Sequence, residues 1–75
     1  MINVAYMDKF GMHCQDYEFN EAVLVVGNLM VYKDILPSVY NHYTDSYEMI
    51  IVPGGDHEPT HFRKELEKYL DSLED

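Results

Sequence analysis

This 75-residue chain has few basic residues, a single cysteine and no tryptophan. Five Lys and Arg stand against 14 Asp and Glu, so the formal net charge is −9. The shortage of cations argues against direct binding to DNA, RNA or anionic lipid, because those partners require clustered Lys and Arg. The single cysteine, Cys14, excludes an intrachain disulfide and is typical of a reducing compartment, so we expect a cytoplasmic protein.

We also expect no membrane-directed segment. No apolar run approaches the roughly 18 residues that would cross a bilayer, and the first eight residues contain no Lys or Arg that could form the basic region of a signal peptide. The apolar share of 47% is nevertheless that of a folding protein rather than of a disordered acidic tail. A chain of this length forms one domain at most, so we predict a single domain over residues 1–75.

The clearest predicted element is a helix at the C-terminal end. Pro59 suits a first helical turn, where the missing N–H is not needed. The apolar residues that follow have a period of 3.6 residues and would form one stripe along the helix: Phe62, Leu66, Tyr69, Leu70 and Leu73. The sequence therefore predicts one long amphipathic helix at this end.

The middle of the chain is rich in β-branched and apolar residues. Residues 22–26 and 29–32 form two such runs, and Gly27-Asn28 between them suits a two-residue turn. We therefore predict a β-hairpin. The alternative is one helix over residues 21–36, which the central glycine and four valines disfavour.

Further strands are predicted on either side of this hairpin. Alternating apolar residues predict a strand at residues 2–7 with a turn at residues 8–11, and residues 47–52 predict another strand. Residues 34–46 fit either a short helix that begins near Pro37 or a loop. Together these elements predict an α+β fold, with a small antiparallel sheet of about four strands packed against one long C-terminal helix.

The predicted hairpin has apolar residues on both of its faces. A single helix covers only one face of a sheet, and a chain this short has little else with which to cover the second. We therefore expect a second copy of the chain to bury that face, which would make the protein a homodimer.

Residues His57-Glu58-Pro59-Thr60-His61 have the spacing of the H-E-x-x-H signature, and this five-residue segment resembles that of the zinc metalloproteases. The resemblance implies His57 and His61 as zinc ligands and Glu58 as the general base. Pro59 disfavours the established helix that the motif requires, and no spacing points to a third ligand. We therefore predict a protein that is not an enzyme and has no cofactor. A zinc-dependent hydrolase is the alternative.

Tyrosines gather between residues 40 and 47. Tyrosine supplies contact area with few rotamers to immobilise and is common at interfaces, so we expect Tyr43 and Tyr47 to contact a partner. The alternative is that these rings complete a small core. A partner contact through the tyrosines also gives an alternative function, namely an interaction module that binds a host protein through its tyrosines and its helix.

The acidic residues outnumber those that solubility requires, since a net charge of about 2–8 suffices for a small domain. The chain resembles, in composition alone, the small acidic inhibitors that bacteriophages encode. We expect a DNA mimic that occupies the nucleic-acid-binding surface of a basic protein. The predicted contact residues are Asp16, Glu18, Glu21, Asp45 and Glu48, with Tyr43 and Tyr47 as the apolar part, and Asp56 and Glu58 are second choices.

Overall fold

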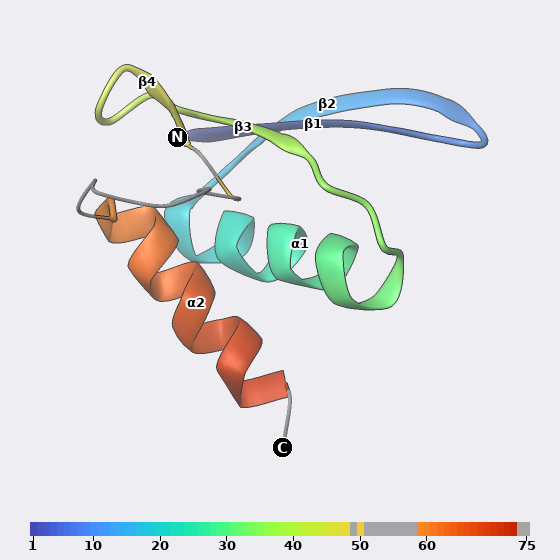
Figure 1. Ribbon diagram of the computed structural model, residues 1–75. Helices are drawn as coiled ribbons and strands as arrows, with labels where there is room; N and C mark the ends of the chain where they lie inside the picture. The colour runs from blue at the N-terminus through green and yellow to red at the C-terminus, as the bar shows by residue number, and fades with distance from the viewer. Residues whose placement is uncertain (49, 51–58, 74–75) are drawn as a thin grey trace.

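The computed structural model describes residues 1–48, 50 and 59–73. The elements follow one another as β1 (Ile2–Asp8), β2 (Gly11–Tyr17), α1 (Phe19–Tyr32), β3 (Ser38–Asn41), β4 (Ser46–Glu48) and α2 (His61–Leu73). The strands form one antiparallel sheet in the order β2-β1-β3-β4, and α1 and α2 lie on the same side of it (Figure 1). The predicted α+β fold with a four-stranded antiparallel sheet is confirmed. The single long helix is wrong, because two helices of 14 and 13 residues are present in the described part of the chain.

The first hairpin joins β1 to β2, which pair from Ile2 opposite Tyr17 to Asp8 opposite Gly11. The turn between them is fixed by two local features. The backbone N–H of Phe10 donates to Asp8 Oδ1 at 2.8 Å, and Gly11 has a φ of 120°, a conformation that favours glycine. The strand predicted at residues 2–7 and the turn after it are confirmed. The pattern does not predict β2, because its residues are largely polar and exposed.

Residues 22–32 belong to α1, so the hairpin predicted there is wrong and the helical alternative is the observed one. A continuous apolar run fits a buried helix as well as a strand, and only its packing partners decide between them. In this fold α1 packs against β1 on one flank and against α2 on another. The two flanks together require apolar residues around most of the helix circumference.

Gly27 lies at the contact between the helices rather than in a turn. A Cβ atom added at Gly27 would lie 2.5 Å from Cδ2 of Tyr69 on α2. The neighbouring Asn28 accepts a hydrogen bond from the Tyr69 hydroxyl at 2.8 Å. The glycine therefore admits the tyrosine ring, and the asparagine holds its polar end.

The strand β3 replaces the helix or loop expected within residues 34–46. It lies between β1 and β4, where Val39 pairs with both Val4 and Glu48. The strand predicted at residues 47–52 is confirmed only as far as Glu48, which ends β4. Ile50 lies in a bend, and residues 49 and 51–52 are outside the described residues.

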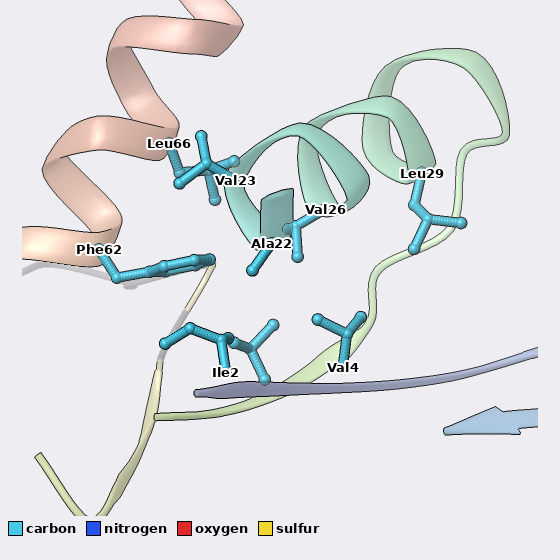
Figure 2. Close-up of a cluster of buried hydrophobic side chains, with 9 residues drawn as sticks. Ile2, Val4, Ala22, Val23, Val26, Leu29, Phe62 and Leu66 are labelled. Carbon is cyan, nitrogen blue, oxygen red and sulfur yellow. The ribbon is translucent and has the colours of Figure 1, made fainter. Parts of the chain in front are cut away.

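The core lies between the sheet and the two helices (Figure 2). Ile2 and Val4 enter it from β1, and the ring of Phe62 on α2 reaches in toward them. Burying a side chain of this size stabilises the fold by about 1.5–3 kcal/mol. Phe62 and Leu66 are buried members of the predicted C-terminal stripe. The helix that carries them packs mainly on α1, so the sheet is not covered by α2 alone.

Neither helix in the described part of the chain is long and apolar enough to cross a bilayer.

Candidate functional site

Both helices of the described residues lie on one face of the sheet, which leaves the other face without a helix from this part of the chain (Figure 1). Side chains alternate between the two faces along a strand, so the residues between those of the core lie on this open face. The pairing register aligns them into three rows that run across the strands. The aspartate–tyrosine row is Asp16, Asn3, Tyr40 and Tyr47; the small-residue row is Cys14, Ala5 and Ser38; and the methionine row is Met12 and Met7.

The aspartate–tyrosine row is connected by direct contacts. Asn3 Nδ2 donates to Asp16 Oδ1 at 2.9 Å, and His42 Nε2 lies 3.8 Å from the same oxygen. The Tyr40 ring meets His42 and Tyr47 edge to face, with centroids 4.8 and 5.0 Å away. A carboxylate, an imidazole and two phenol rings therefore adjoin one another on the open face.

Asp45 closes the far end of this arrangement, in the turn between β3 and β4. The Tyr40 hydroxyl donates a hydrogen bond to Asp45 Oδ1. That bond favours the neutral phenol and, together with burial and the nearby negative charge, raises the pKa of Tyr40. Tyr43, in the same turn, is 62% exposed, and Tyr47 is 73% exposed. The structure thus brings Asp16, Asp45 and Tyr47 to one end of the open face and leaves Tyr43 exposed beside them.

Glu18 and Glu21 lie where α1 begins. Glu18 is the residue before the first helical turn, and Glu21 is within that turn. Both side chains are exposed, and the partial positive charge of a helix N-terminus stabilises carboxylates there. Asp16 and Glu18 do not share a strand face as expected, because β2 ends at Tyr17. No Lys or Arg occurs from residue 10 to residue 32, so these acids have no basic neighbours in the sequence.

Glu48 is placed differently from the other predicted contact acids, because it is buried with only 6% exposed. Its Oε1 accepts a hydrogen bond from Asn41 Nδ2 at 2.8 Å, and its Oε2 accepts one from the Thr60 hydroxyl. Asn41 Oδ1 in turn accepts from the Tyr43 backbone N–H at 2.9 Å, and Thr60 Oγ1 accepts from the Arg63 N–H at 3.2 Å. Glu48 therefore joins the β3–β4 turn to the start of α2 and is not part of the open face.

Replacing Glu48 with leucine should lower the free energy of unfolding by about 1–3 kcal/mol. Asn41 and Thr60 would both lose a buried acceptor, and unpaired buried donors are costly. Urea denaturation followed by circular dichroism measures the change. Glu21→Leu removes an exposed carboxylate from the first turn of α1 and is the matched control, expected to lower the free energy of unfolding by less than about 1 kcal/mol. Equal stability of the two variants would contradict the structural role assigned to Glu48.

The histidines of the H-E-x-x-H segment are only partly described. His57 and Glu58 lie outside the described residues, as does Asp56. His61 is the first residue of α2, and its ring stacks on Phe19 with centroids 5.0 Å apart. The described residues contain no group of three or more His, Cys, Asp or Glu side chains placed to hold a metal. The predicted lack of catalysis stays a prediction.

The homodimer also stays a prediction, but the sequence argument for it is wrong. That argument assumed a hairpin with two apolar faces, whereas residues 22–32 form a helix packed on two sides. Some apolar side chains of α1 are still exposed, among them Leu24, Val31 and Tyr32. Light scattering at micromolar concentration, compared with the chain mass of 8.8 kDa, would determine the association state.

Three members of the group connected to Asp16 and Tyr47 were not predicted as contact residues from the sequence: Asn3, Tyr40 and His42. Asn3 and Tyr40 are brought together by the pairing of β1 with β3, and the backbone N–H of His42 donates to the Met1 carbonyl just beyond that pairing. Both of these contacts join residues far apart in the chain. The alternation of Tyr40 with Val39 and Asn41 is the one local signal that could have placed a tyrosine on a sheet face. Comparisons of the chain with protein-family models, with curated proteins and with solved structures found no match.

Proposed function

We propose that this chain is a small non-enzymatic inhibitor that binds a basic protein at the surface which that protein uses for nucleic acid. The observation that carries this proposal is the placement of unburied acids and tyrosines at one end of the sheet and at the adjoining start of α1. The set comprises Asp16, Glu18, Glu21, Asp45, Tyr43 and Tyr47. Glu48 is left out of the proposed surface because it is buried.

The distribution of basic residues supports this surface. Arg63, Lys64 and Lys68 are on α2, Lys9 is in the β1–β2 turn, and Lys33 follows the last residue of α1. These are the five basic residues of the chain, and none of them lies on the open face or in the first turn of α1. No Lys or Arg therefore lies beside Asp16 on the open face itself, and the net negative field of the chain attracts a cationic partner.

The proposed mechanism is steric and electrostatic competition without chemistry. A groove of Lys and Arg that fits a polyanion accepts carboxylates, and the acids accelerate encounter through long-range attraction. Because Asp16 is held on a paired strand and Asp45 is hydrogen-bonded to Tyr40, binding requires little ordering of these residues. Tyr43 and Tyr47 would add apolar contact area beside the charges.

Affinity capture from a nuclease-treated bacterial lysate, followed by binding assays on the purified partner, tests this function. Exposed charges act through attraction that salt screens, so the dissociation constant should rise at least tenfold between ~50 mM and ~500 mM salt. The captured protein should also bind DNA or RNA. Equal affinity at both salt concentrations would contradict the proposal. It would favour the alternative of an interaction module centred on the exposed tyrosines Tyr43 and Tyr47.

A further inference from the structure

The open face contains a cavity of about 480 Å³. Asn3, Asp16, Tyr40 and Tyr47 line it from the aspartate–tyrosine row, and His42 adjoins them. Ala5 and Ser38 line it from the small-residue row. The cavity therefore lies within the surface proposed above for partner binding, at the boundary between these two rows.

The hollow arises from side-chain size. Ala5 is on the central strand β1, and the register places Cys14 and Ser38 directly beside it on β2 and β3. Three small side chains abreast lower the surface between a row of large polar side chains and the methionine row of Met7 and Met12. The depression therefore results from the small side chains in this row, since the strands pair regularly there.

The lining chemistry suits a planar cation. Asp16 supplies a carboxylate whose Oδ1 already accepts from Asn3, so in the described residues Oδ2 is the oxygen left for a ligand. Tyr40 lies two strands from Asp16, and its ring is held in place by its edge-to-face contact with Tyr47. Tyrosine faces attract cations, and arginine stacks on them more readily than lysine does. No Lys or Arg is among the residues that line the cavity.

We propose that this cavity binds an arginine side chain of the partner, and this inference rests on the proposed function. The guanidinium group donates to the Asp16 carboxylate and lies against the ring of Tyr40, the nearer of the two tyrosines in the row, while the methylene groups of the arginine lie over Ala5 and Ser38. Arginine fits better than lysine because its planar group donates hydrogen bonds and stacks at the same time. A partner that binds nucleic acid presents arginines for phosphate contacts, so a suitable side chain is available on it.

The test uses small probes and the intact chain, without the partner. N-acetyl-arginine amide is titrated into ¹⁵N-labelled protein, with N-acetyl-citrulline amide as the uncharged analogue. Amide shifts should concentrate at Asn3, Ala5, Ser38 and Tyr40, and the citrulline probe should bind roughly tenfold more weakly, as expected for loss of a charged contact and a cation–π contact. Equal binding of the two probes would overturn the proposal.

Variants locate the probe in the cavity. Ala5→Leu fills the hollow without changing the charge, and Asp16→Asn keeps the shape but removes the charge, so each should weaken arginine-probe binding roughly tenfold. Ser38→Leu fills the same row from β3 and replaces Ala5→Leu if that variant does not fold. Asp71→Asn removes an exposed acid on α2, outside both the cavity and the proposed surface, and should leave probe binding unchanged. If Ala5→Leu or Ser38→Leu bound the arginine probe as tightly as the parent does, the proposal would be overturned.

The outcomes also separate this inference from the proposed function. If the probe binds in the cavity but the chain fails to displace nucleic acid from its partner, the arginine site stands and the nucleic-acid competition is wrong. If displacement occurs but Ala5→Leu binds the partner as the parent does, the competition stands and the arginine site is wrong.

Discussion

Replacing Asp16, Glu18 and Glu21 together with lysine should slow association with the basic partner at least tenfold at low salt. Each replacement adds two positive charges, so the formal net charge changes from −9 to −3. Association rates between charged proteins depend steeply on such changes, because the field steers the encounter. Stopped-flow mixing at ~50 mM salt measures the rate, and repetition at ~500 mM salt should remove most of the difference.

The matched control changes the same amount of charge elsewhere. Glu65, Glu67 and Asp71 are on α2, and their replacement with lysine gives the same net charge on a different surface. This control should slow association less than the first variant if the partner docks at the end of the sheet. Equal rates for the two variants would show that net charge alone matters and that no defined acidic surface exists.

The fold of the first variant should persist with a modest loss of stability. Lysine at the positions of Glu18 and Glu21 would be unfavourable near the N-terminus of α1, by about 0.3–1 kcal/mol each. All three side chains are exposed, so their replacement leaves the core intact. Urea denaturation should therefore show a folded protein whose slow association is not a consequence of unfolding.

Replacing Gly27 with leucine should lower the free energy of unfolding by about 3 kcal/mol, at the upper end of the range for overpacked cores. Even the first added atom, Cβ, would lie 2.5 and 2.6 Å from two ring carbons of Tyr69. A chain of this length has a total stability of only about 4–11 kcal/mol, so the variant loses a large share of it. Leucine has the higher helix propensity, so a stabilised variant would contradict the helix contact described here.

A second substitution tests whether the clash with Tyr69 is the cause. Tyr69→Ala in the Gly27→Leu background should recover part of the lost stability, so the double variant should be more stable than the sum of the single effects predicts. Asn20→Leu adds the same side chain at an exposed position of α1 and is the control for helix propensity. Additive effects of Gly27→Leu and Tyr69→Ala would show that these positions do not interact.

The elements predicted correctly are those that pack on only one side, because their apolar residues then recur with the period of a strand or a helix. β1 alternates because one of its faces meets the core, and α2 has a stripe because one of its sides meets α1. α1 lacks such a pattern because two of its sides are covered. Gly27 within it was therefore interpreted as a turn residue, whereas it is the point at which Tyr69 approaches the helix closely. β3 was missed because a four-residue strand becomes evident only through its pairing with β1.

The candidate site shows the same division. Exposure of Asp16, Glu18 and Glu21 follows from their charge, since unpaired carboxylates are rarely buried. Their positions at a sheet end and a helix start follow from their adjacency in the chain. The burial of Glu48 depends on Asn41 and on Thr60, which is 12 residues further along the chain, and no local pattern indicates that contact. The small residues that line the cavity, Ala5 and Ser38, were likewise unpredictable, because they come from two strands that are far apart in the chain.

Displacement of nucleic acid from the partner tests the central claim most directly. Labelled duplex DNA is bound to the captured partner, and this protein is added in increasing amounts while fluorescence anisotropy reports the bound DNA. We expect complete release of the DNA, and we expect that at least tenfold more protein is required when Asp16, Glu18 and Glu21 are replaced with lysine. A stable complex in which the partner holds both the DNA and this protein would contradict the central claim.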